Sequence, residues 1–418
     1  MNAPAEWIGE RPTALQLGVI LLVGVCGVMI AGLQPLLLGT LAQEGRISAA
    51  QLGHAATAEL LLMGAASAYA GGRWKAERLR AIGILSSLAL AGLNVATVWT
   101  NGETVTLVRA LAGVPSGILI WITVAMIARS PTPERWSGIY LTIQTLAQFV
   151  LAAALAAWVI SRSGANGGFV ALAVMCVISA LAAFLLPDRF APLVADNASS
   201  NMPNTRGLIA LAAPFLWMAF IVGVWVYAEP LSRQAGHAPT VAGVAVSISL
   251  ACQVLGGATA TLLAGRLRWF PALVFCALVN VGCLLAFAAL PSESLYLLTS
   301  GVFGFLWLFS LPFMVPMVIA ADPTRRAALL VGGAELAGGS LGPLLASFVV
   351  SDIDVRGALG FGAVSLAITV AIAFALHRRE RALPTDHVVE SGRGPCDATP
   401  SKGATFAGLP SRKPDHES

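Results

Sequence analysis

The 418-residue chain is 57% hydrophobic and only 11% charged, and it carries a net charge of +4. This composition is typical of a polytopic α-helical membrane protein and excludes a soluble globular protein. A helix needs about 20 mainly apolar residues to cross the ~30 Å hydrocarbon core of a bilayer. Twelve such stretches follow one another along the chain, at 14–41, 49–71, 80–100, 104–128, 136–160, 167–186, 207–228, 240–264, 270–290, 294–320, 326–350 and 356–376.

The twelve predicted helices fall into two sets of six on either side of one polar linker. Pro35 near the end of the first span and Pro230 near the end of the seventh suggest a weak internal repeat, which is typical of duplicated transporter halves. The last segment is rich in Gly and Pro without apolar periodicity, which predicts disorder. The expected parts are a cytoplasmic segment 1–13, a six-helix bundle 14–187, a linker 188–206, a second bundle 207–376 and a tail 377–418.

The basic residues indicate how the chain is oriented. Twenty of the 25 Lys and Arg residues lie in connections on one side or in the tail, whereas the other side has only Arg46, Arg162, Arg233 and Arg356. The positive-inside rule therefore predicts both termini in the cytoplasm and the spans in the plasma or inner membrane. Because these residues are topology signals, we expect no nucleic-acid partner.

Other residue types argue against several functions. The six cysteines form no CxxC pair, so neither disulfides nor a metal site is expected. None of the three lysines follows a glycine, which excludes the phosphate-binding loop of an ATP-driven pump. No histidine lies at membrane depth and no HExxH motif is present, which argues against an intramembrane enzyme. We expect no cofactor.

Prolines mark every third predicted helix. A proline inside a membrane helix frees a backbone carbonyl and permits a kink, which is tolerated where the helix lines protein or a water-filled cavity. This pattern predicts that spans 1, 4, 7 and 10 surround the pathway. The prolines well inside spans are Pro35, Pro115, Pro214, Pro230, Pro312 and Pro316, with Pro343 in span 11.

The fourth span opens with Arg109-Ala-Leu-Ala-Gly113-Val-Pro-Ser-Gly117. This run resembles the RxxxGxxxG motif in the fourth helix of the major facilitator superfamily, and the resemblance covers about 14–376. The loop from Gly71 to Arg80 is similar to a degraded form of that family's loop after helix 2. The resemblance implies an all-α fold of two pseudo-symmetric six-helix bundles that move about a central cavity lined by helices 1, 4, 7 and 10.

The fifth span departs from the exporters of that family. It lacks their GxxxGPxxGG signature, and a related Gly338-Gly339-Ser-Leu-Gly342-Pro343 lies in span 11 instead. This departure favours uptake over efflux.

Four charged residues lie at membrane depth or at its edge: Glu59, Arg109, Glu229 and Glu335. A charge there costs roughly 2.5–3.5 kcal/mol on insertion scales, so each must be paired, near an interface or functional. Arg109 could tune a carboxylate or hold an anion, and Glu59 could carry a proton or form a structural pair with Arg109. Glu335 is a candidate proton carrier, and Glu229, expected opposite Gln34, could form a substrate rim or a solvated helix end.

Polar and aromatic residues on the cavity helices suit an amphipathic or aromatic solute, although aromatic rings at the membrane interface would give a similar pattern. The candidates are Gln34, Trp121, Gln144, Gln148, Trp217, Trp225, Tyr227, Gln253, Trp307 and Phe309. The pairs Gly113/Gly117 and Gly338/Gly342 have the small-xxx-small spacing that lets helices approach closely.

These features together predict a secondary active transporter that moves a small organic solute by alternating access. We expect a monomer that couples uptake to protons. Proton-coupled efflux of drugs or hydrophobic metabolites is the alternative, and a transporter-like sensor would bind a ligand without accumulating it.

Overall fold

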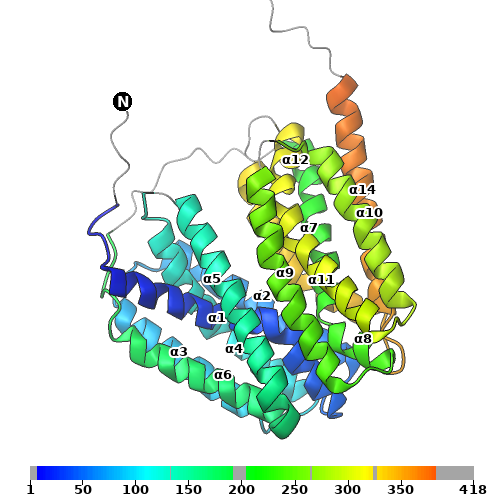
Figure 1. Cartoon of the computed structure of the whole chain (residues 1–418). Helices are drawn as coiled ribbons and strands as arrows, with labels where there is room; N and C mark the ends of the chain where they lie inside the picture. Colours follow the sequence, from blue (N-terminus) through cyan, green and yellow to red (C-terminus); the bar gives the residue numbers. More distant parts are fainter. Residues whose placement is uncertain (1–6, 132, 192–203, 264–265, 323–326, 383–418) are drawn as a thin grey trace, which may run out of the picture.

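The computed structural model of the chain describes residues 7–131, 133–191, 204–263, 266–322 and 327–382. Most of the expected linker and the tail beyond Ala382 lie outside the described residues. Figure 1 shows the helices, which are α1 (Ala14–Gln43), α2 (Ala49–Arg73), α3 (Leu79–Thr97), α4 (Glu103–Ile127), α5 (Pro133–Ala154), α6 (Ser161–Ala183), α7 (Thr205–Trp225), α8 (Ala228–Gln234), α9 (Pro239–Leu263), α10 (Trp269–Ala288), α11 (Glu293–Ser310), α12 (Met314–Ala321), α13 (Val331–Ser347) and α14 (Gly357–Ala382).

Each predicted span is helical, and α14 extends six residues past its expected end. Within the described ranges, nine helical segments are long and apolar enough to cross a membrane, and one of them, Trp136–Ala183, contains two predicted spans. Two helices, α2 and α13, fall outside this set: α2 carries His54 and Glu59, and α13 has only 17 residues. The arrangement is compatible with twelve spans.

Two of the proline-containing spans are broken. Span 7 divides into α7 and α8 at Val226 and Tyr227, just before Pro230. Span 10 divides into α11 and α12 at a 3-10 turn, Leu311–Phe313, which contains Pro312. The missing amide hydrogen and the ring of proline explain why the regular helix stops at these places. By contrast, α1 and α4 continue through Pro35 and Pro115.

The two halves repeat the same helix packing. Helix α2 packs on α4 as α9 packs on α11, and α3 packs on α6 as α10 packs on α14. Helix α1 contacts α5 and α6, and α7 correspondingly contacts α13 and α14. The fold is therefore two pseudo-symmetric six-helix bundles, as the sequence predicted.

Glycines set the closest helix contacts in both halves. A Cβ atom on Gly113 or Gly117 would overlap the backbone of α2 at Glu59 or Met63. A Cβ atom on Gly338 or Gly342 would likewise overlap backbone atoms of α7. In a bilayer, helices associate through such close packing, since lipid chains are as apolar as the side chains.

Among the described residues, the hydrogen bonds between the halves lie at one end. We call the end where α1 begins at Ala14 the near end, and the end where it stops at Gln43 the far end. In Figure 1, α1 runs from the left edge to the lower right, whereas α9, α10 and α14 run from the top to the lower right. The two bundles therefore converge at the far end and diverge toward the near end.

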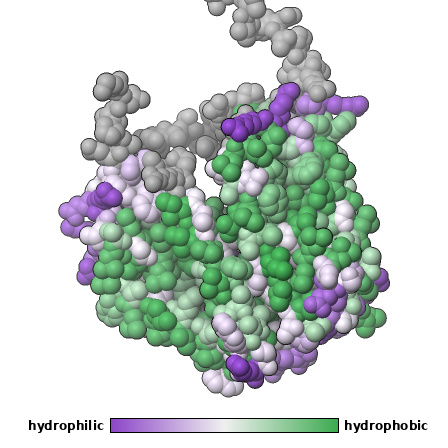
Figure 2. All heavy atoms as spheres, viewed as in Figure 1, coloured by the Kyte–Doolittle hydropathy of each residue, from purple (hydrophilic) through white to green (hydrophobic). Residues whose placement is uncertain are grey.

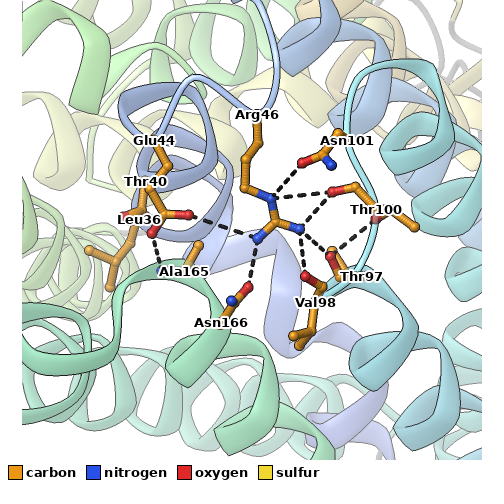
Figure 3. Close-up of polar contacts among 10 residues, drawn as sticks. All are labelled: Leu36, Thr40, Glu44, Arg46, Thr97, Val98, Thr100, Asn101, Ala165 and Asn166. Carbon is orange, nitrogen blue, oxygen red and sulfur yellow. Dashed lines mark hydrogen bonds and ion pairs between the residues drawn. The ribbon is translucent and has the colours of Figure 1, made fainter.

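A partly buried cluster around Arg46 holds the far end of the first half together. Arg46 donates to the Thr97 carbonyl oxygen at 2.6 Å and to Asn166 Oδ1 at 2.6 Å, and Glu44 Oε1 accepts from the Ala165 amide at 2.7 Å. Figure 3 shows how Arg46 and Glu44 reach groups near the end of α3 and the start of α6. The cluster links the ends of α1, α3 and α6.

Apolar side chains cover the surface between the two ends. Figure 2 shows hydrophobic residues over the middle of the visible face of both halves and hydrophilic residues at its margins. Exposed leucines occur on helices of both halves, for example Leu85, Leu181, Leu262 and Leu285. Such a belt marks a multi-pass membrane protein.

We predict that Gly117→Ala lowers the thermal stability of the purified protein by about 1–3 kcal/mol, because its methyl group would meet the α2 backbone at Met63 and Ser67. Thermal unfolding in detergent, followed by tryptophan fluorescence, measures the change. Gly92→Ala on α3 is the matched control, since a Cβ atom there meets nothing within 4 Å. Equal melting temperatures for the two variants would contradict the packing role.

Candidate functional site

A buried ion pair lies at the centre of the first half. Arg109 Nε donates to Glu59 Oε2 at 3.1 Å, and Arg109 Nη2 donates to Glu59 Oε1 at 2.5 Å. Both side chains are completely buried. Gly113, one turn after Arg109, lies against the Glu59 carbonyl, so the small residue brings α4 close enough for the guanidinium to meet the carboxylate. The pairing that the sequence predicted is present.

Two further helices complete the shell around Arg109. Its Nη1 donates to Asn94 Oδ1 at 2.9 Å and to Thr97 Oγ1 at 3.2 Å, both on α3. Its Cζ atom lies 5.3 Å from the centroid of the Phe169 ring on α6. The guanidinium is therefore occupied by two-point contact with a carboxylate, by two neutral oxygen acceptors and by a cation–π contact.

Little free space adjoins this pair. The cavity beside Glu59 and Arg109 measures ≈ 10 Å³, and Cys26, Ser116 and Cys176 also line it. A cavity of roughly 10–15 Å³ holds a single water molecule. An organic solute has no room there, and every contact described for the pair lies within the first half.

The far end contains the hydrogen bonds that join the halves. At the first residue of α2, the Ala49 amide donates to Asp352 Oδ1 at 2.7 Å, and the Tyr227 hydroxyl donates to the Ala49 carbonyl oxygen at 3.1 Å. Gly53, one turn along α2, fits against Pro343, Ser347 and Tyr227. We call Ala49, Tyr227 and Asp352 the far-end latch. Among the described residues, these two are the hydrogen bonds between the halves.

Glu229 belongs to this closed region, and the alternative of a solvated helix end is wrong for it. Its side chain is only 4% exposed, so the helix end is not solvated. It lies against Gly39 of α1, because α8 follows the break in span 7 and packs on α1. The Oε2 atom of Glu229 has no hydrogen-bond partner in the described part of the chain.

Glu335 lies toward the near end, on the first turns of α13. Its side chain is half-buried, and no hydrogen bond or ion pair is found for it among the described residues. The neighbouring Gly332 and Gly333 are exposed and face open space. The two candidate carboxylates of the second half, Glu229 and Glu335, therefore lie at opposite ends of it.

The aromatic candidates of the second half pack on one another. Trp225 and Trp307 form an edge-to-face pair with centroids 5.6 Å apart. Trp217 Nε1 donates to Ser310 Oγ at 2.8 Å, and Phe309 stacks on Phe305 at 5.5 Å. Of these candidates, Trp307 is the only half-buried one and the others are buried.

The polar and first-half candidates lie in several places. Gln34 Nε2 donates to the Ala56 carbonyl oxygen at 3.4 Å, and Gln148 Nε2 donates to the Val28 carbonyl oxygen at 3.1 Å, so both hold neighbouring helices of the first half. Trp121 packs edge-to-face on Trp74. Gln144 is half-buried, and Gln253 is buried on α9, which packs against α5 across the halves.

Sequence reasoning missed three residues of these arrangements. Asn94 and Thr97 stand three residues apart in the third span and so share a helix face, which is a readable signal for two acceptors facing one partner. Asp352 gives no such signal, since it is one of several polar residues in a short connection. Its contact with Ala49 depends on how the two halves meet.

No protein-family model and no curated protein matches this sequence. Solved transporter structures do match. The crystal structure of the nucleoside transporter NupG is 14% identical, with a TM-score of 0.62 over 88% of this chain and 99% of that chain. A bacterial homologue of the human lysosomal transporter Spinster, in an inward-facing and unoccupied conformation, is 12% identical, with a TM-score of 0.62 over 90% of this chain and 99% of that chain.

These likenesses, together with the helix packing, define a multi-pass α-helical membrane protein. Both neighbours are major facilitator superfamily transporters, and the chain has the fold of that superfamily. At this identity the comparison shows the fold alone.

We predict that Glu59→Gln or Arg109→Gln alone destabilises the protein by about 3–5 kcal/mol, because each leaves an unpaired buried group. The double variant Glu59→Gln/Arg109→Gln loses less than the sum, since its amides can bond to each other. Unfolding in a denaturing detergent titration measures the three changes. The exposed Glu293→Gln serves as the control for a simple loss of charge. Additive losses would show that the two side chains do not depend on each other.

Proposed function

We propose that this protein is a secondary active transporter that moves a small organic solute across the membrane by alternating access. The observation that carries the proposal is the arrangement of the halves, which are latched at the far end through Ala49 and diverge toward the near end. Alternating access requires two halves whose contacts at either end form and break in turn. A latch of two hydrogen bonds is weak enough to be reversed.

The fold and the charge pattern support this reading. The solved neighbours are transporters, one of them described as inward-facing. The basic connections on the near-end side, which include Arg73 and Lys75, favour a cytoplasmic location for that end. With this orientation, the arrangement described here is open toward the cytoplasm.

We assign proton coupling to Glu335 before the other carboxylates. Glu59 is held by Arg109 within one half, so its surroundings do not depend on how the halves move. Glu335 is half-buried, has open space beside it and has no partner among the described residues. A carboxylate in such a place can take up and release a proton as its exposure changes. Glu229, closed in at the far end, is the second candidate.

The contacts of Arg109 also bear on the solute. Because this guanidinium is fully engaged in the first half, it is not available to bind an anion. The aromatic side chains of the second half, with Trp225 and Trp307 at their centre, favour a moderately apolar or aromatic solute over a small anion. The buried Nε1 atom of Trp225 has no hydrogen-bond partner in the described part of the chain and could serve as a donor to such a molecule.

We favour symport with protons into the cell, because the fifth helix lacks the exporter signature. Antiport of drugs or hydrophobic metabolites is the competing direction. A sensor with the same fold would bind a solute without accumulating it.

We expect proteoliposomes containing the protein to accumulate a solute when an inward proton gradient is imposed. A panel of nucleosides, aromatic amines and organic acids, with a pH-sensitive dye inside the vesicles, measures solute and proton movement together. Inward movement of both establishes symport, whereas opposite movement establishes antiport. Binding without accumulation would overturn the transport proposal.

We predict that Glu335→Gln abolishes gradient-driven accumulation while exchange of solute across the membrane continues, because the amide carries no titratable proton. Exposed Glu293→Gln, on α11 of the same half, is the matched control and retains accumulation. Accumulation by Glu335→Gln that stayed fully dependent on the gradient would remove this residue from the coupling role.

We predict that Asp352→Ala or Tyr227→Phe weakens the far-end latch and shifts the protein toward opening at that end. A Ser347→Cys substitution in a background without native cysteines provides the reporter, since Ser347 is only 5% exposed and lies beside Gly53. A membrane-impermeant maleimide should label this reporter faster in the latch variants.

The neighbouring carboxylate provides the control for the latch. Asp354 lies two residues away in the same connection, but it binds Gln234 and Arg356 within the second half. Hydrogen bonds from Arg356 and Gln234 lower the pKa of the Asp354 carboxyl below its ordinary value. Asp354→Ala should leave labelling unchanged, and equal acceleration by both substitutions would argue against the latch.

A further inference from the structure

A long apolar groove lies on the outside of the second half, away from the contact between the halves. It has a volume of ≈ 750 Å³ and runs between α10 and α14, which lie side by side at the edge of the molecule in Figure 1. Volumes of about 300–1,000 Å³ are typical of ligand sites. The groove exists because α14 presents Ala363, Ala367 and Ala371 at intervals of four residues, opposite the longer Leu278 and Val281 of α10.

Two arginines close one end of the groove. Arg378 and Arg379 line it at the near-end terminus of α14, and both are exposed. The Cζ atom of Arg378 lies 5.0 Å from the centroid of the Phe374 ring, which also lines the groove. This cation–π contact directs the guanidinium over the apolar channel. The remaining lining residues are apolar, so the positive charge of the groove lies at the end formed by these two arginines.

We propose that this groove binds an anionic phospholipid, with an acyl chain between α10 and α14 and the phosphate headgroup on Arg378 and Arg379. The groove faces the hydrocarbon of the bilayer, so lipid molecules are the ligands that surround it. Paired guanidinium groups at a headgroup level favour an anionic phosphate over a zwitterionic one.

The length of the groove fits this occupant. Its lining extends along α14 from Ala363 to Arg379, about 24 Å at the helical rise of 1.5 Å per residue. One leaflet of hydrocarbon is about 15 Å thick, half of the bilayer core. The groove is therefore longer than one leaflet is thick, and an acyl chain whose headgroup binds the arginines can lie in it along its full length. A second copy of the chain would bring the arginines of two copies together, whereas a phosphate headgroup brings an opposite charge to them.

Native mass spectrometry of the delipidated full-length protein tests the proposal. Dioleoyl phosphatidylglycerol should bind more tightly than dioleoyl phosphatidylcholine, and Arg378→Gln/Arg379→Gln should weaken phosphatidylglycerol binding by at least about tenfold. Ala367→Leu/Ala371→Leu fills the groove without changing charge and should also remove the tight adduct. A phosphatidylglycerol with a photoreactive acyl chain should cross-link to α14 in the unaltered protein and not in the filled variant.

The matched control is Arg73→Gln/Lys75→Gln, which removes two exposed basic residues from the near end of the first half. This variant should keep the tight adduct. Equal affinity for the two lipids, an equal loss in the control, or cross-links confined to other helices would overturn the proposal. A dimer in the unaltered protein that the alanine-to-leucine variant converts to monomer would instead identify the groove as an interface between copies.

Discussion

The first half is organised around the desolvated guanidinium of Arg109. A fully buried cation must find its partners within the protein, because the surrounding hydrocarbon offers none. Four helices supply or support them: α2 the carboxylate of Glu59, α3 two neutral oxygens, α4 the arginine itself and α6 an aromatic face. The glycine contacts between α2 and α4 bring the charges within reach of each other. The pair therefore fixes the relative positions of most helices in this half.

The second half has the same packing without such a centre. Its closest helix contacts also depend on glycines, at Gly338 and Gly342, but its interior contains aromatic rings and hydroxyl groups where the first half has an ion pair. Two of its spans are broken near prolines, and its carboxylates at Glu229 and Glu335 are not paired with a cation in the described structure. In the function proposed above, the groups that would respond to a proton or a solute therefore lie in the second half, whereas the charged pair of the first half is held within that half.

Much of this arrangement could be predicted from local sequence. The spans follow from hydropathy, since the bilayer sets the helix length, and Arg109 and Glu59 could be paired because both lie in the outer part of one bundle. The surroundings of Glu229 could not be predicted, because its burial depends on α8 turning back onto Gly39 of a helix nearly 200 residues earlier. The contact of Asp352 with Ala49 could not be predicted for the same reason. It joins two halves, and the sequence pattern of one half does not show which residues of the other half it meets.

Helix α2 joins the interior of the first half to the seam between the halves. Glu59 is ten residues along the helix from Ala49, a distance of about 15 Å at the helical rise. By anchoring Glu59, Arg109 sets both the rotation and the height of α2, and hence where its first amide is presented to Asp352. The contact between the halves at Ala49 therefore depends on Arg109, although every contact described for Arg109 lies within the first half. If the chain works by the alternating access proposed above, a substitution at Arg109 would therefore alter the contact at Ala49 as well as the packing of the first half.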